Sequence, residues 1–145
     1  MAADPINPPH YTSHPSGVQA IEVAEQWGWC LGNVFKYMIR AGRKGDAIED
    51  FCKARWYLAR EIDRRQCRVD TAEVEARSRR SQRCAAAYAR FVDAEPDAEI
   101  RQIVQLLWAA EFAPSSIGDA AVVVPLLTAL EIVDQMIAAR SRSTS

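Results

Sequence analysis

A stripe of polar side chains in the segment 31–41 has the residue types needed to bind an anion. Its members recur at the spacing of one helix face, and they are Asn33, Lys36, Tyr37 and Arg40. Arg43 and Lys44 follow in the next turn, so four cations fall within nine residues. Beside the N-terminus of the following helix, whose free N–H groups attract anions, they would form a phosphate site without a glycine-rich loop. The alternative is a solvated face with salt bridges to Glu49 and Asp50.

Two carboxylates and a lysine begin the segment after this turn, and they are Glu49, Asp50 and Lys53. Carboxylate oxygens are ligands that Mg²⁺ accepts. A carboxylate beside a phosphate site could also act as a base towards a phosphoryl acceptor. We therefore predict that Glu49 and Asp50 hold Mg²⁺. The alternative for Glu49 is a structural role, as the capping-box partner of Asp46.

The N-terminal segment 1–15 carries four of the seven prolines. Because proline fixes φ and lacks an N–H, we expect an extended arm there and neither a helix nor a central strand. The arm presents Asn7, His10 and Tyr11. His10 and Tyr11 could close over a nucleotide base by stacking and hydrogen bonding. The alternative is that Tyr11 packs on the core and anchors the arm.

Hydrophobic periodicity and capping signals predict helices along the rest of the chain. Their expected extents are about 16–27, 31–41, 46–66, 71–92, a helix from Asp97 past Trp108, and a last helix with Pro125 near its first turn. The expected helix starts include a capping box of Ser16 with Gln19 and a cap at Asp46.

The fold class predicted from these elements is all-α. We expect a small helical domain with its extended Pro-rich arm over residues 1–68, and an additional helical half over 69–145. Residues 113–118 are expected to form a loop. Residues 122–124 could form a short strand instead of helix, and the last six residues are expected to be a frayed tail.

Composition limits the function classes. The chain has 145 residues, 49% of them apolar, and a net charge of -1 from 18 basic and 19 acidic side chains. This is typical of a globular protein and disfavours nucleic-acid binding by bulk charge. The chain shows neither a secretory signal nor an uninterrupted apolar run of the ~18 to 20 residues that span a bilayer, so we expect a cytoplasmic protein without membrane contact. The four cysteines are expected to be reduced, and a P-loop motif is absent.

The spaced segments N-P-x-H-Y from Asn7, G-N-x-x-K-Y-x-x-R-x-G-x-K from Gly32 and E-D-x-x-K-A from Glu49 resemble a phage family. That family was long catalogued as a domain of unknown function and is labelled phage nucleotide kinase. The resemblance covers about residues 6–63. It implies a phage or prophage origin and phosphoryl transfer to deoxynucleoside monophosphates without a Walker motif.

We therefore expect a nucleotide-binding protein with nucleoside monophosphate kinase activity, ATP as phosphate donor and Mg²⁺ as cofactor. The expected catalytic residues are Lys36, Arg40 and Asp50. The expected substrate-binding residues are Asn7, His10, Tyr11, Asn33, Tyr37, Arg43, Lys44 and Lys53, and the expected metal ligands are Glu49 and Asp50. The alternative is a module that sequesters a nucleotide without turnover or docks onto another protein. We also expect a homo-oligomer.

Overall fold

Helices form nearly all of the described chain. The computed structural model describes residues 4–66, 71–113 and 119–143, with side chains described outside 71–78 and 119–121. In these ranges the helices are α1 (Pro9–Thr12), α2 (Ala20–Ala24), α3 (Trp29–Arg40), α4 (Ala47–Gln66), α5 (Thr71–Ala94), α6 (Ala98–Glu111) and α7 (Asp119–Ser143). The all-α prediction is confirmed. The described residues contain no strand, and residues 122–124 belong to α7.

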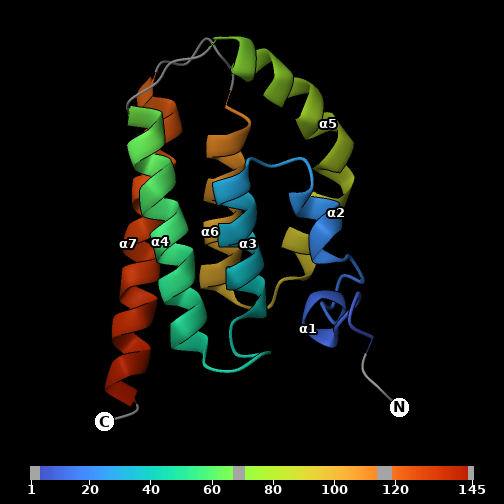
Figure 1. Ribbon diagram of the computed structural model, residues 1–145, viewed down its shortest axis with the longest axis vertical. Helices are drawn as coiled ribbons and strands as arrows, with labels where there is room; N and C mark the ends of the chain where they lie inside the picture. Colours follow the sequence, from blue (N-terminus) through green and yellow to red (C-terminus); the bar gives the residue numbers. More distant parts are fainter. Residues whose placement is uncertain (1–3, 67–70, 114–118, 144–145) are drawn as a thin grey trace.

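Four of these helices form an antiparallel bundle. α3 packs on α4, α4 on α7, α7 on α6, and α6 on α3, which closes a ring of contacts. Neighbours in the ring run in opposite directions (Figure 1), as expected for helices joined by short connections. α1 and α2 lie against α3, and α5 contacts α2 and α6. The N-terminal segment therefore covers one side of the bundle next to α3.

A single apolar core joins the two predicted halves of the chain. Its largest fully buried side chains come from both halves and include Phe35, Phe51, Phe91, Leu107 and Met136. Each bundle helix supplies a stripe of apolar residues at helical spacing to this core. The predicted boundary at residue 68 falls in the segment 67–70, outside the described residues. The half that carries the predicted site therefore shares its core with α6 and α7.

The turn between α3 and α4 sets the register of the site. α3 ends at Arg40, one residue before the predicted end at Ala41, and Gly42 and Gly45 then have φ values of 75° and 78°, which favour glycine. Asp46 accepts the backbone N–H of Ile48 at 2.9 Å. The predicted cap at the start of the third helix is thus present. This turn places the first turn of α4 beside the last turn of α3.

The N-terminal segment differs from its prediction in two places. The arm is not wholly extended, because Pro9 begins a single helical turn, α1, and proline is well suited to a first helical position. The helix expected over 16–27 is wrong in extent, since α2 spans only Ala20–Ala24. Its capping box is made by Gln19 and Glu22 rather than by Ser16 with Gln19. The hydroxyl of Ser16 instead accepts the N–H of Val18 at 3.1 Å.

The last helix extends beyond its predicted limits. Pro125 lies inside α7, in its second turn rather than its first, where it removes one backbone hydrogen bond. The expected frayed tail is helical through Ser143. The start of α6 agrees with prediction, because Asp97 accepts the N–H groups of Glu99 and Ile100. Most of the loop expected over 113–118 lies outside the described residues.

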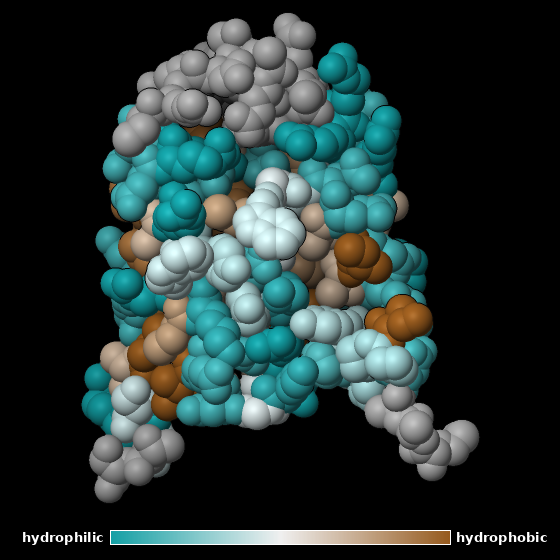
Figure 2. Space-filling model, viewed as in Figure 1, coloured by the Kyte–Doolittle hydropathy of each residue, from teal (hydrophilic) through white to brown (hydrophobic). Residues whose placement is uncertain are grey.

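Residues Val122–Ser143 of α7 are long and apolar enough to cross a membrane by length and composition, and 22% of their most apolar stretch is buried. A helix of a soluble bundle passes the same test. α7 places Leu126, Ala129 and Val133 in the core, and Figure 2 shows hydrophobic side chains on the outer face over α4 and α7. The predicted absence of membrane contact stays a prediction.

A buried ionic network links the C-terminal ends of α4 and α6 to the N-terminal end of α3. Arg65 of α4 donates to Glu61 at 2.5 Å, to Glu111 of α6 at 2.8 Å and to the carbonyl of Ala110 at 2.6 Å. Glu111 also accepts the N–H of Gly28, directly before α3, at 3.1 Å. The side chains of Arg65, Glu61 and Glu111 are at most 5% exposed. Because these charges are desolvated, removal of Arg65 would leave Glu111 without its close cation, whereas Glu61 would keep Arg64, which donates to it at 2.8 Å.

A second buried contact fastens the N-terminal arm to the corner between α5 and α6. His14 Nε2 lies 3.0 Å from Glu95, and its ring stacks on Phe91. His14 Nδ1 accepts the N–H of Ser16 at 3.2 Å, so Nε2 carries the proton that Glu95 accepts. Burial lowers the pKa of His14, against the opposing effect of Glu95. The neutral imidazole is therefore the form that fits this contact.

We predict that Arg65→Met costs about 3–5 kcal/mol of unfolding free energy, because it takes the close cation from the buried carboxylate of Glu111 and leaves Glu61 with Arg64 alone. Arg55→Met is the matched control. The Arg55–Asp134 pair is 47% and 46% exposed, and its loss should cost less than about 1 kcal/mol. Urea denaturation of both variants measures the difference. Equal losses of unfolding free energy in the two variants would contradict a stabilising role of the buried network.

We predict that the unfolding free energy falls as the pH drops below about 6.5. The folded-state pKa of His14 lies below its ordinary value of 6.5, so between the two values the unfolded chain binds more protons. Stability is therefore retained above that range and lost on acidification. His14→Gln should flatten the pH dependence between pH 7.5 and 5.5 in urea titrations, and His10→Gln, at a less buried position, should change it less. An unaltered slope in His14→Gln would contradict the assignment.

Candidate functional site

The polar stripe of α3 and the start of α4 meet around the ring of Tyr37. Lys36 Nζ lies 4.5 Å from the ring centroid, Arg40 Cζ 4.8 Å and Lys53 Nζ 5.9 Å. A cation within about 6 Å of an aromatic face is attracted by the ring quadrupole. The antiparallel packing of the two helices thus gathers three of the predicted cations at one place. Arg43 and Lys44 lie in the exposed turn directly after them.

Arg40 and Asp50 neutralise each other at the base of this cluster. Arg40 Nη2 donates to Asp50 Oδ1 at 2.6 Å, and Arg40 Nε lies 3.2 Å from both carboxylate oxygens. The Asp50 side chain is only 2% exposed and that of Arg40 is 15% exposed. The hydrogen bond to Asp50 raises the pKa of Arg40, against the effect of burial. Arg40 is thus committed to an internal partner, apart from a 3.4 Å contact with the Tyr11 hydroxyl.

Lys36 is the cation of the stripe that lacks an acidic partner among the described residues. Its Nζ donates to Asn33 Oδ1 at 2.8 Å, and Asn33 Nδ2 in turn donates to the carbonyl of Trp29 at 2.8 Å. Asn33 is buried and Lys36 is half-buried. The amide therefore orients the ammonium without neutralising it. Lys36 remains available to a negatively charged ligand.

The other predicted groups of α4 form an exposed pair. Lys53 donates to Glu49 four residues earlier, and their side chains are 41% and 65% exposed. The hydrogen bond to Glu49 raises the pKa of Lys53. Glu49 thus serves as the partner of Lys53. This contact is separate from the capping box with Asp46, which was the alternative role for Glu49. Such exposed pairs contribute little to stability and open readily for a ligand.

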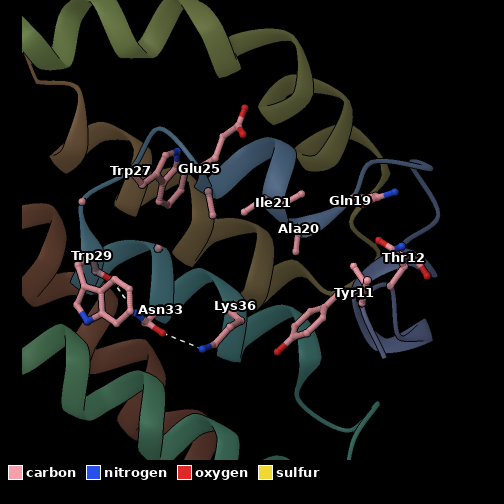
Figure 3. A pocket seen from close by; sticks show the side chains of 15 residues that line it. Tyr11, Thr12, Gln19, Ala20, Ile21, Glu25, Trp27, Trp29, Asn33 and Lys36 are labelled. Carbon is pink, nitrogen blue, oxygen red and sulfur yellow. Dashed lines mark hydrogen bonds between the residues drawn. The ribbon is translucent and has the colours of Figure 1, made fainter. Parts of the chain in front are cut away.

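A cleft of about 630 Å³ lies beside this cluster, between the arm, α2 and α3. Tyr11 comes from the arm, Ile21 from α2, and Trp29 and Lys36 from α3, and all four line it. Figure 3 shows Trp29 at one end of the cleft and Tyr11 at the other, with Asn33 and Lys36 between them. The cleft is mostly apolar with a few polar groups, as in small-molecule sites.

The arm supplies part of the cleft wall. Asn7 lines the cleft, and its amide donates to Asp4 at 3.1 Å. His10 packs on Tyr11 with ring centroids 4.3 Å apart but does not line the cleft. Partial burial, and then the charges of Lys44 and Arg40, lower the pKa of His10. The structure therefore brings Asn7 and Tyr11 to the cleft and leaves His10 behind Tyr11.

Several cleft residues were missed by reasoning from sequence. They include Ile21, Trp29 and Gly32, and Trp29 is 79% exposed. Gly28 and Gly32, one turn apart, do not by themselves signal the cleft, because a Cβ at Gly32 would make only an ordinary van der Waals contact, 3.6 Å from the Ala24 carbonyl oxygen. The exposure of a tryptophan depends on which helices cover it, which periodicity does not reveal.

The predicted metal ligands do not form a prepared Mg²⁺ site. Both oxygens of Asp50 accept from Arg40, and this carboxylate is nearly inaccessible. Glu49 is paired with Lys53. The described part of the chain holds no group of three or more His, Cys, Asp or Glu side chains placed to bind a metal ion. The residues present therefore fit a ligand that brings negative charge better than a resident cation.

The fold and site define a small helical-bundle protein with an apolar cleft and a cationic edge. Residues 6–59 match the model of a family described as a protein of unknown function, DUF3310. This stretch contains the arm, α2, α3 and the first part of α4, and thus the whole candidate site. The predicted resemblance to a family of unknown function is therefore confirmed over residues 6–59. The match assigns no activity to the chain. No curated protein matches the chain, and no solved structure does so either.

Proposed function

We propose that this protein binds a nucleotide, with the base and sugar in the cleft and the phosphate at Lys36. The observation that carries the proposal is the position of Lys36. Its ammonium is held by Asn33, lacks an acidic partner among the described residues, and lies at the edge of a cleft of about 630 Å³. Clefts of this size commonly hold small molecules.

The cleft offers separate surfaces to the two parts of such a ligand. Trp29 and Tyr11 present aromatic faces and Ile21 an aliphatic one, which suits a planar base. Lys36 provides a point charge for phosphate. Lys53 lies 5.9 Å from the centre of the Tyr37 ring and adds positive potential. Arg40 acts as a positioning residue in this proposal, since it holds α3 against α4 through Asp50.

A finer proposal is phosphoryl transfer from ATP to the bound nucleoside monophosphate, giving ADP and the nucleoside diphosphate. The convergence of cations from two helices supports it, because stabilisation of charge on the transferring group is the main catalytic task. When bound, Mg²⁺ would supply further neutralisation of the phosphates. The engagement of Asp50 by Arg40 supports the second candidate, a protein that sequesters a nucleotide without turnover. Homo-oligomer formation and a phage or prophage origin stay predictions.

We predict that Lys36→Ala weakens binding of a deoxynucleoside monophosphate by about tenfold or more, the loss expected for one charge-assisted hydrogen bond. Calorimetric titration of each of the four deoxynucleoside monophosphates measures this effect. Arg83→Ala, at an exposed position of α5, is the control and should leave the affinity unchanged. Absence of binding by the unaltered protein would overturn the proposal.

Turnover distinguishes the two candidates. If the protein is a kinase, a coupled assay with ATP, Mg²⁺ and each deoxynucleoside monophosphate should release ADP, and Lys36→Ala should lower that rate by at least tenfold. Asp50→Asn should reduce stability because it removes the partner of Arg40, so its rate is compared only at temperatures where it remains folded. Binding without ADP release would reject the kinase and leave sequestration.

A further inference from the structure

A row of aromatic rings continues from the cationic cluster along α4, outside the cleft. Tyr37 stacks on Tyr57 with centroids 5.9 Å apart, and Tyr57 meets Trp56 edge-on at 4.9 Å. Arg60 lies over the Trp56 ring at 5.6 Å. We call Tyr37, Tyr57 and Trp56 the aromatic row. None of the three lines the cleft.

The outer end of the aromatic row is exposed. Trp56 is 57% exposed, whereas Tyr37 and Tyr57 pack partly against the core. Pale side chains of intermediate hydropathy gather between hydrophilic ones over α3 and α4 in Figure 2. The Trp56 indole is thus exposed to water while its neighbour Tyr57 holds it edge-on. An exposed indole offers a flat face to a second planar group.

Positive charge lies at both ends of the aromatic row. Lys36 and Lys53 lie at its inner end and Arg60 at its outer end. Glu49 is the only acidic partner shown for these three among the described residues. Aromatic faces interleaved with cations recur where proteins bind successive nucleotides, since every base has a π-face and every linkage a phosphate. The positive charge along the aromatic row is therefore largely unpaired within the described part of the chain and complements the phosphate of a nucleotide.

We propose that the aromatic row is a second nucleotide subsite, distinct from the cleft and joined to it at Lys36. This inference rests on the proposed function in one respect, because it assigns the adjoining cleft to the first nucleotide. Lys36 lines the cleft and also lies over Tyr37. Its ammonium can therefore contact the phosphate of a nucleotide in the cleft and that of a nucleotide on the aromatic row. The second nucleotide is either a free nucleotide or the next residue of a short single strand.

Calorimetric titrations with three probes test this proposal: dTMP, ATP and the 5′-phosphorylated dinucleotide pdTpdT. We expect either a second equivalent of free nucleotide per chain or tighter binding of the dinucleotide than of dTMP by about tenfold, the gain typical of one stacked base. The first result identifies a free nucleotide as the occupant, and the second a linked one. Trp56→Ala should remove this second event and leave the first equivalent of dTMP unchanged.

Three further variants separate the two sites. Trp56→Phe retains a stacking face and should restore most of the second event. Cys52→Ala, at an exposed position on the same helix, should have no effect. Ile21→Trp fills the cleft and should weaken the first event while the aromatic row still binds.

Each outcome decides one proposal. One equivalent of dTMP that is insensitive to Trp56→Ala, with no gain for pdTpdT, overturns the second subsite and leaves nucleotide binding in the cleft intact. Binding that persists in Ile21→Trp but is lost in Trp56→Ala supports the aromatic row and overturns the cleft. Absence of any binding overturns both.

Discussion

The buried pair of Arg40 and Asp50 holds the last turn of α3 against the first turn of α4, and the geometry of the site depends on it. A carboxylate with 2% of its side chain exposed needs its partner, because an uncompensated buried charge is strongly unfavourable. The pair therefore fixes the distance between the two helices. With the helices so placed, Lys36 and Lys53 both lie close to the ring of Tyr37. Arg40 thus holds the two helices together, and Lys36, whose ammonium donates to the amide of Asn33, remains for a ligand.

Local signals in the sequence predicted much of the fold. The end of α3 before Gly42 and the caps at Asp46 and Asp97 are correct, since each depends on backbone chemistry within a few residues. The errors arose where two tendencies competed. Proline at position 9 was read as a helix breaker, although at a first helical position it begins a turn. Ser16 and Gln19 satisfied the pattern of a capping box, yet Gln19 with Glu22 satisfied it one turn later.

Reasoning from the sequence could also predict that the stripe of α3 faces the start of α4, because a short turn joins two helices with known periods. It could not predict which charges neutralise each other. Asp50 and Glu49 are adjacent in sequence, but one is buried against Arg40 and the other is exposed beside Lys53. Nor could it predict the cleft, which requires α2 and the arm to lie across α3. Contacts such as that of His14 with Glu95 span 81 positions and leave no periodic signal.

Glu111 joins the stretch that matches the family model to a part of the chain that the model does not match. Glu111 lies outside residues 6–59, yet its carboxylate accepts the N–H that precedes α3 and pairs with Arg65. α4 likewise packs along α7. Without the second half of the chain, this flank of α3 and α4 would be exposed to water. α6 and α7 thus act as a built-in cover for the helices that carry the site.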